Sequence, residues 1–348
     1  MKAVVKEKVG ENGTLLKDVD VPEIGEDEVL VKVIACGVGA GDYKLYKDDP
    51  YILDMAKLPV ILGLENSGVV EAVGKKVEKW SPGDRVVCDG YIQTCGLCEY
   101  CRTGYYIMCR EIKWFGRSVD GAMAEYFKAP SRTLHRIPDN VSFKEAVVVE
   151  DASVVYNSLF QRCKIEPNTR AVILGPGAIG LIGLQMLKIC GAKKVLVAGL
   201  SLDKTRLSIA EKLGADVTVE VDKEDLNKIV YDVFGQDGVD LVLEASGAPE
   251  AIAQAAKLVK RDGAIVAIGI PPPTTETPFP WRTLVTNSIK VYGTFGATAV
   301  SWDRTFEMFS TKKIRLDFIV DKEYTISQWK EAFKAFAERE SMKPLIIP

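Results

Sequence analysis

This chain of 348 residues contains a single histidine, His135. A Ser-His-Asp triad or a metal site built from several histidines is therefore not expected unless His135 takes part. The surrounding TLHRIP alternates apolar and polar residues, which predicts a strand and favours a structural or surface role for His135.

Long apolar runs and an excess of positive charge are also missing. No stretch is long enough to cross a membrane, and the N-terminal MKAVVKEKVGENG lacks the apolar core of a signal peptide. The formal net charge of −3 leaves no basic stripe for nucleic acid. We therefore expect a cytoplasmic protein whose partners include a small-molecule substrate but no nucleic acid and no membrane.

The length predicts two domains, and the pattern changes near residue 151. Before it, short strands such as EVLVKVIACG, SGVVEAVG and GDRVVCD are separated by turn residues, with no long helical period. After it, apolar strands such as RAVILG and VDLVLEAS alternate with amphipathic helices at 203–213, 223–234 and 249–260. That alternation predicts a parallel sheet with helices on both faces. Residues 270–280, IPPPTTETPFP, are expected to form a stiff, turn-rich connection.

The strongest binding motif is a glycine-rich turn between an apolar strand and a helix. Its residues are Gly175, Gly177, Ala178, Ile179 and Gly180. In this βαβ context the glycines permit a tight turn, close approach of a pyrophosphate and helix–strand packing, with the phosphates at the helix N-terminus. We predict a dinucleotide site here.

The end of the next strand bears on the choice between NAD and NADP. Gly199 stands where NAD enzymes usually carry an acid, and Ser201, Lys204 and Arg206 follow and could hold a 2′-phosphate. Asp203 is the counter-argument, because it could serve as a displaced acid. We favour NADP, with NAD as the alternative.

Four of the eight cysteines cluster in YIQTCGLCEYCRTGYYIMC: Cys95, Cys98, Cys101 and Cys109. Their spacing suits a closed tetrahedral zinc site, in which no position is left for chemistry. We predict one structural zinc, with an iron–sulfur cluster as the less favoured alternative.

Taken together, these motifs resemble the zinc-containing medium-chain dehydrogenase/reductase family of alcohol, sorbitol and threonine dehydrogenases. The resemblance covers essentially the whole chain and rests on GDRVV, the cysteine lobe, DGAMAEY, the glycine turn and VLEASG. It implies an NAD(P)-dependent dehydrogenase/reductase with the structural zinc and dinucleotide sites just described. The implied fold is α/β, with a GroES-like β-rich catalytic domain and a Rossmann doubly wound parallel-sheet domain.

The resemblance fails where the family holds its catalytic zinc, at the stretch VIACGVGAGDYKLY (33–46), which we expect to be a loop. The family pattern there reads A-C-G-V-C-G-T-D-x-H, and a second landmark reads G-H-E-x-x-G. In this chain Gly39 replaces the ligand cysteine, Gly41 the relay hydroxyl, Lys44 the relay histidine and Leu64 the ligand histidine. The stretch is interpreted as a catalytic loop without its zinc ligands.

Two carboxylates remain at this site, Glu65 and Glu150, and alone they make a poor zinc site. Hydride transfer belongs to the nicotinamide and needs no metal, but a proton donor must then stand near the substrate oxygen. Lys44 and Tyr43 are the nearest candidates, with Asp42 to orient the lysine. The two glutamates could share a proton or bind a polar substrate.

The leading hypothesis is a zinc-independent, NADP-linked oxidoreductase acting on a polyol or sugar-like alcohol or carbonyl. The alternatives are a reductase of an activated C=C or C=N bond, and a non-catalytic nucleotide-binding protein. A catalytic metal held by Cys36, Asp42, Glu65 or Glu150 is a further alternative.

We place the GroES-like domain at 1–151 and 295–348, with a zinc lobe at about 88–116, and the Rossmann domain at 152–294. In similar proteins a strand like SIKVYGTFG pairs across a two-fold axis. The resemblance therefore implies a homodimer or homotetramer.

Overall fold

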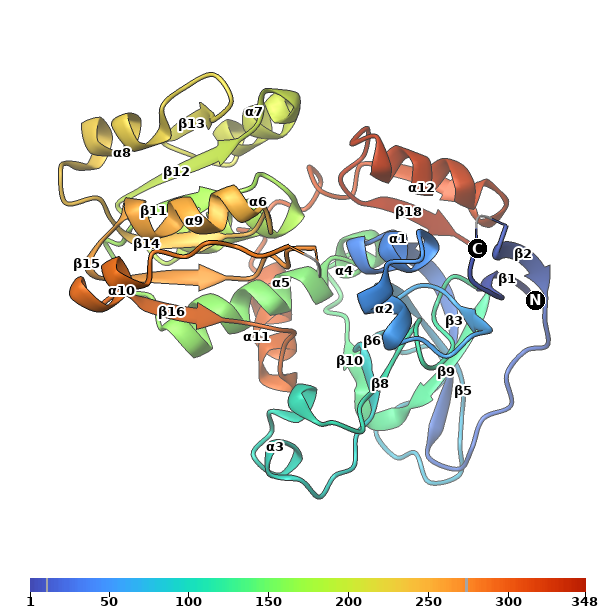
Figure 1. Cartoon of the computed structure of the whole chain (residues 1–348). Coiled ribbons are helices and arrows are strands. Elements are labelled where there is room, and N and C mark those ends of the chain that lie inside the picture. Colours follow the sequence, from blue (N-terminus) through green and yellow to red (C-terminus); the bar gives the residue numbers. More distant parts are fainter. Residues whose placement is uncertain (11, 273–274) are drawn as a thin grey trace. The chain divides into compact units, whose positions relative to one another are not determined.

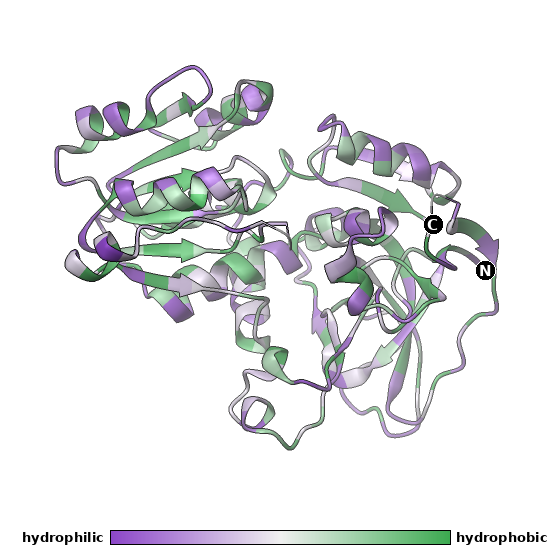
Figure 2. Cartoon of the chain, in the orientation of Figure 1, coloured by the Kyte–Doolittle hydropathy of each residue, from purple (hydrophilic) through white to green (hydrophobic). Residues whose placement is uncertain are grey.

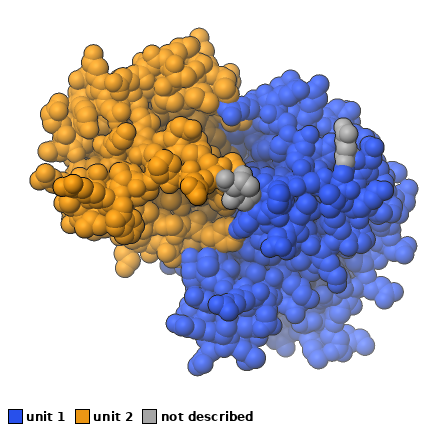
Figure 3. Space-filling model, viewed as in Figure 1, with its two compact units in different colours: residues 1–150, 298–310, 316–348 blue, residues 151–297, 311–315 orange. Residues whose placement is uncertain are grey.

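The computed structural model describes every residue except 11, 273 and 274, so part of the connection expected at 270–280 lies outside the described residues. It divides the chain into two compact units, which Figure 3 distinguishes by colour. Unit 1 comprises Met1–Glu150, Thr298–Ser310 and Leu316–Pro348, and unit 2 comprises Asp151–Ala297 and Thr311–Arg315.

Unit 1 is built mostly from antiparallel strand pairs, although β17 and β18 pair in parallel. Its largest sheet has the order β10-β6-β5-β3-β18-β17, with β9 also paired to β3, and a smaller sheet has the order β2-β1-β4. The long strand β3 is central because it pairs with β5, β9 and β18. The strands are β1 (Lys2–Lys6), β2 (Thr14–Asp18), β3 (Glu28–Gly37), β4 (Val60–Ile61), β5 (Asn66–Val73), β6 (Arg85–Cys88), β7 (Tyr91–Gln93), β8 (Lys113–Trp114), β9 (Tyr126–Pro130), β10 (Leu134–Arg136), β17 (Lys322–Thr325) and β18 (Pro344–Ile347).

The helices of unit 1 are mostly short, and one C-terminal helix completes the core. Aromatic side chains of α12 pack on α1, where the ring of Tyr46 lies 5.8 Å from that of Trp329 and 5.2 Å from that of Phe333. The helices are α1 (Ala40–Tyr46), α2 (Pro50–Asp54), α3 (Glu99–Arg102), α4 (Phe143–Ala146), α11 (Ala299–Ser310) and α12 (Trp329–Ala337). Helix α5 (Val149–Tyr156) begins at the end of the first segment, and a π-helical turn at Asn157–Cys163 follows it.

Unit 2 contains the predicted parallel sheet, with the strand order β13-β12-β11-β14-β15-β16. Every neighbouring pair in it is parallel. Figure 2 shows its central strands as mostly hydrophobic, which is expected where helices cover both faces. The strands are β11 (Arg170–Leu174), β12 (Lys194–Gly199), β13 (Val217–Glu220), β14 (Val239–Glu244), β15 (Val259–Ala267) and β16 (Lys290–Gly293).

Five helices accompany this sheet (Figure 1): α6 (Ala178–Ile189), α7 (Lys204–Lys212), α8 (Leu226–Phe234), α9 (Pro249–Leu258) and α10 (Trp281–Thr286). The helices expected at 203–213, 223–234 and 249–260 therefore exist, with shorter bounds. The strand order reverses between β11 and β14, and the carboxyl ends of strands at such a switch point form the usual ligand site of a doubly wound sheet.

Among the described residues, no helix combines the length and the apolar character that crossing a bilayer requires.

Candidate functional site

The stretch expected to be one loop is largely regular structure. Strand β3 runs to Gly37, as predicted for EVLVKVIACG, but α1 starts at Ala40 after Gly39, so the expectation of a loop is wrong from Ala40 to Tyr46. The reason lies in Asp42, whose carboxylate accepts the N–H of Gly39 at 3.4 Å and the N–H of Gly63 at 2.9 Å. The first contact caps the helix, and the second ties α1 to the segment that carries Glu65.

Asp42 is fully enclosed, and burial raises the pKa of its carboxyl, while the Gly63 N–H and the positive charge of Arg117 act in the opposite direction. Both carboxylate oxygens are bound to backbone N–H groups. Asp42 thus organises the backbone of the site.

The most buried charged pair of this region joins Glu65 to Lys343. The Lys343 ammonium lies 2.6 Å from each carboxylate oxygen of Glu65, and both side chains are about 95% buried. Lys343 immediately precedes β18, which pairs with β3 through Leu345↔Gly37 and Ile346↔Cys36. That register brings Lys343 to the start of α1.

The glycines at 37 and 39 make room for this pair. A Cβ atom added at Gly39 would lie 2.2 Å from Glu65 Oε1 and 3.7 Å from Lys343 Nζ, and one added at Gly37 would lie 2.8 Å from Glu65 Oε2. The ion pair therefore occupies the space that the side chain of a ligand cysteine at position 39 would need.

A second cation fills the side-chain space of position 41. A Cβ atom added at Gly41 would lie 2.2 Å from Nη2 of Arg117. The relay hydroxyl that the family carries at this position thus has its place taken by a guanidinium. The sequence analysis identified neither Arg117 nor Lys343. The one available signal concerned Lys343, which is a basic residue directly before the last apolar strand.

The other residues predicted from this stretch have different surroundings. The ring of Tyr43 packs 5.7 Å from Phe336 and 6.3 Å from Tyr46, so its ring belongs to the packing between α1 and α12. Lys44 is half-buried, three residues after Gly41 on α1, and no ion pair involves it within the described part of the chain. Glu150 is the second residue of α5, and one of its carboxylate oxygens lies within 4.8 Å of an oxygen of Glu65.

The zinc site of the family is incomplete in this chain. Gly39 and Leu64 offer no ligand atom, and the carboxylate of Glu65 already binds an ammonium. Cys36 is fully buried, and burial raises the pKa of its thiol well above the usual range, which opposes the thiolate that a metal needs.

The glycine turn has the geometry that its motif predicts. Gly175 adopts a φ of +107°, and a Cβ atom at Gly180 would lie 2.0 Å from the carbonyl oxygen of Gly175. Gly177 caps α6, whose first residues are Ala178 and Ile179, and nothing lies within 4 Å of where its Cβ would be. The open space and the helix N-terminus fit a dinucleotide pyrophosphate, while the other two glycines allow the turn and the close packing.

The residues considered for a 2′-phosphate lie just after β12. The backbone N–H and the hydroxyl of Ser201 both donate to Asp222. Arg206 lies 3.6 Å from the buried Asp203, which also accepts the N–H of Leu200.

Lys204 is exposed at the start of α7. At Gly199 a Cβ would lie 2.7 Å from the ring of Pro176, so an acidic side chain at that position would collide with the glycine turn.

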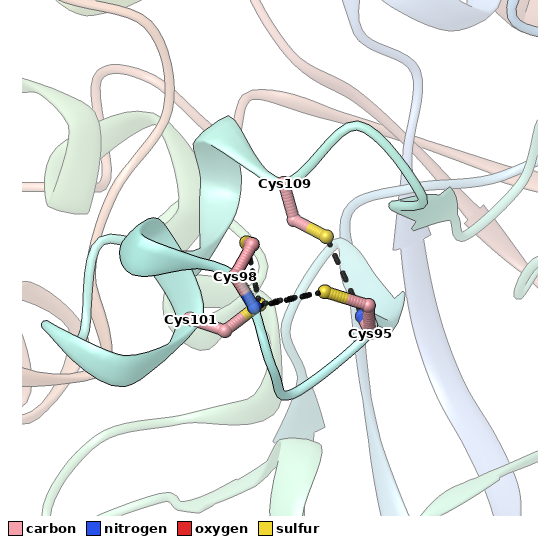
Figure 4. A group of neighbouring side chains, drawn as sticks. All are labelled: Cys95, Cys98, Cys101 and Cys109. Atoms are coloured by element: carbon pink, nitrogen blue, oxygen red, sulfur yellow. Dashed lines mark hydrogen bonds between the residues drawn. The ribbon is translucent and has the colours of Figure 1, made fainter.

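The four cysteines of the lobe converge, as Figure 4 shows. The Sγ atoms of Cys98 and Cys101 are 3.5 Å apart and those of Cys95 and Cys101 are 3.9 Å apart. A zinc–thiolate tetrahedron with bonds of ~2.3 Å has sulfur–sulfur edges of about 3.8 Å. Backbone N–H groups point at two of the sulfurs, and the N–H of Cys98 contributes most to lowering the pKa of Cys95 to about 7. The lobe fits a structural zinc.

His135 lies on β10, away from the motifs above in sequence, and joins elements of unit 1. Its ring stacks on Trp302 at 5.1 Å, and its nitrogens lie 3.1 Å from Asp303 and 3.7 Å from Asp89. Burial lowers the pKa of His135, but the two carboxylates outweigh it and raise that pKa overall. These contacts suit a structural role for His135, which is one of the two roles that the sequence favours.

Comparison with known proteins agrees with this geometry. The alcohol dehydrogenase GroES-like domain family matches residues 25–139, and the zinc-binding dehydrogenase family matches residues 178–311. A D-arabitol-phosphate dehydrogenase of Enterococcus avium is 32% identical over 99% of this chain and 97% of its own length. A sorbitol dehydrogenase of Halalkalibacterium halodurans is 30% identical over 100% of this chain and 99% of its own.

A solved structure with a TM-score of 0.92 comes from Sinorhizobium meliloti, and it is assigned as a zinc-binding dehydrogenase and bound to NADP. It is 27% identical and covers 100% of this chain and 99% of its own. The chain belongs to the zinc-type medium-chain dehydrogenase/reductase family. Within that family it is an NAD(P)-dependent oxidoreductase of the alcohol and polyol dehydrogenase type, with a small-molecule substrate. The predicted GroES-like and Rossmann fold class is confirmed.

Proposed function

We propose that this chain moves a hydride between NADP and a polyol or sugar-like alcohol or carbonyl, without a catalytic zinc. The observation that supports this proposal is the Glu65–Lys343 pair, with 2.6 Å between ammonium and carboxylate, next to a glycine where the family has a ligand cysteine. A catalytic zinc places positive charge beside the substrate oxygen. Here a buried ammonium brings positive charge to the same region.

Each predicted residue takes a role in this scheme. The nicotinamide, when bound, accepts the hydride from the alcohol carbon or returns it to the carbonyl. Lys343 polarises the substrate oxygen, and Glu65 holds the ammonium in place. In the oxidative direction the hydroxyl proton passes to the amine of Lys44, and in reduction it returns. Asp42 fixes the helix that carries Lys44, and Glu150 accepts a hydrogen bond from a further substrate hydroxyl.

The named relatives support a polyol as the substrate class. Two of them carry the names sorbitol dehydrogenase and D-arabitol-phosphate dehydrogenase, at 30% and 32% identity over essentially the whole chain. A polyol presents several hydroxyls, which suits a site where the carboxylates of Glu65 and Glu150 lie close together and an ammonium binds Glu65. Tyr43 contributes a wall of this site through its ring, which is fixed by Phe336.

For the cofactor, NADP is supported by the absence of a carboxylate at Gly199 and by the cations of Lys204 and Arg206 on α7. The NADP-bound relative gives further support. The carboxylate of Asp222 at Ser201 opposes a phosphate at that hydroxyl, so we assign the 2′-phosphate to the two cations. The structural metal is assigned as one zinc per chain in the four-cysteine lobe.

The assembly is proposed to be a homodimer or homotetramer formed through β16, in a cytoplasmic protein. This strand is an edge of its sheet in the described structure, and Val291 on it is 46% exposed. Light scattering of the wild type and of Val291→Lys tests this, with a smaller particle expected for the variant.

The function is tested by assaying hydride transfer on matched polyols, their carbonyl forms, enones and imines, with each cofactor, before and after a chelator that spares the lobe zinc. Turnover of polyol or carbonyl that survives the chelator is expected, with higher kcat/KM for NADP. Turnover confined to enones or imines would replace the proposal with the alternative reductase. Activity lost with a weakly bound metal and restored by zinc would contradict zinc independence.

A further inference from the structure

Arg117 lies beside the proposed reaction site in a position that its backbone fixes. It follows β8, its N–H donates to Trp114 O at 3.2 Å, and its carbonyl accepts the N–H of Lys57 at 3.0 Å. The guanidinium carbon lies 5.5 Å from the centroid of the Trp114 ring, and that ring is itself packed 5.1 Å from Tyr91. An arginine supported on both sides loses little further freedom when it binds a ligand.

The direction of the guanidinium is defined by Gly41. A Cβ atom there would lie 2.2 Å from Nη2 and 3.3 Å from Cζ of Arg117, so the cation reaches the face of α1 where the family carries a reacting hydroxyl. Gly39, beside the Glu65–Lys343 pair, is two residues away, which is at most about 7 Å along the chain. The ammonium of Lys343 and the guanidinium of Arg117 therefore lie against the same short segment of the chain.

The charge of Arg117 is not matched within the part of the chain that the structure describes. No ion pair and no side-chain hydrogen bond joins it to a described residue, although it is half-buried. Its charge partly offsets the rise that burial causes in the pKa of Asp42, but both oxygens of Asp42 are bound to backbone N–H groups. A guanidinium has five donors, and a half-buried cation without a partner is costly unless a ligand supplies the anion.

The chemistry of a guanidinium favours an anion with several oxygens. Its fork of N–H donors suits the planar or tetrahedral oxygens of a carboxylate or phosphate. Lys44, the proposed proton acceptor, lies three residues after Gly41 on α1, and residues at this spacing are neighbours on a helix surface.

We propose that Arg117 binds an anionic substituent of the substrate, so that the substrate is a phosphate monoester or carboxylate of a polyol or sugar. This rests on the proposed function for the reaction, but the anion site itself does not depend on turnover. The dinucleotide phosphates have a separate site at the glycine turn on α6.

The kinetic test uses a hexitol, its phosphate monoester and the corresponding sugar acid with the wild type and three variants. In Arg117→Met the ratio of kcat/KM for the anionic substrate to that for the neutral hexitol should fall on the order of 10- to 100-fold. Gly41→Ala should also lower this ratio, because its Cβ displaces the flexible end of Arg117 and leaves the charge in the protein. Arg261→Gln removes an exposed cation of unit 2 and should leave the ratio unchanged.

A binding experiment tests the anion site without relying on catalysis. Inorganic phosphate and acetate are titrated calorimetrically into the NADP-loaded wild type and Arg117→Met, so that the glycine turn is already occupied. Binding to the wild type that weakens in the variant supports the site, and the preferred anion distinguishes phosphate from carboxylate. Equal binding in both proteins, or none in the wild type, overturns the inference. Turnover of neutral polyols with no preference for anionic substrates would overturn the anion site and leave the proposed function intact. Anion binding through Arg117 without any turnover would support the anion site and contradict the proposed function.

Discussion

Removing one partner of the Glu65–Lys343 pair should destabilise unit 1 strongly. Both side chains are about 95% buried, and the ammonium and carboxylate are 2.6 Å apart. In Lys343→Met a buried carboxylate loses its countercharge, and in Glu65→Gln a buried ammonium does. Each change should lower the free energy of unfolding by about 3–5 kcal/mol. The double variant removes both charges, so its loss should be smaller than the sum by about 1–3 kcal/mol.

The assay is denaturant unfolding of the two single variants and the double variant, followed by tryptophan fluorescence. Lys76→Met is the control, because Lys76 and Glu26 are also 2.6 Å apart, but their side chains are 71% and 62% exposed. That exposed pair should contribute at most about 1 kcal/mol. If the losses in the two single variants add within about 0.5 kcal/mol in the double variant, the two charges are not coupled and the reasoning fails.

Three further outcomes follow from the geometry. Cys98→Ser should lose the lobe zinc in elemental analysis and unfold at a lower temperature, and retention of full zinc would contradict a four-cysteine site. Replacing Lys204 and Arg206 by alanine should raise KM for NADP about tenfold or more relative to KM for NAD, since each lost charged contact costs about 1.5–3 kcal/mol. The raised pKa of His135 means that its pairing with Asp303 stabilises the fold below the unfolded histidine pKa of ~6.5 and is lost as the pH rises through the folded value. Asp303→Asn should therefore cost up to about 1 kcal/mol at mildly acidic pH and less at alkaline pH, and a pH-independent cost in unfolding experiments would refute this.

The parts of the molecule that the sequence predicts are those whose partners are close in the chain. The glycine turn, from Gly175 to Gly180, is a local strand–turn–helix, so its spacing alone indicates its conformation. The four cysteines lie within fifteen residues, from Cys95 to Cys109, and their convergence follows from the same local spacing. The parallel sheet is predictable because each apolar strand is followed by an amphipathic helix.

The proposed reaction site was not predictable in the same way, because its residues are far apart in the sequence and meet through long-range strand pairing. Glu65 and Lys343 are 278 residues apart, and they meet only because β18 pairs with β3. Arg117 reaches Gly41 from a turn that no local pattern indicates. Tyr43 has the sequence position of a catalytic residue, yet its ring packs on Phe336, whose α12 comes from the C-terminal segment. Loss of the zinc ligands was visible in the sequence, and the residues that fill their space were not.

Zinc independence of the reaction is tested by measuring zinc per chain and the hydride-transfer rate on the same protein, purified without chelator. One zinc per chain, bound in the cysteine lobe, is expected in an active enzyme. Two zincs per active chain would contradict it, because the second ion would need the place that Glu65 and Lys343 fill.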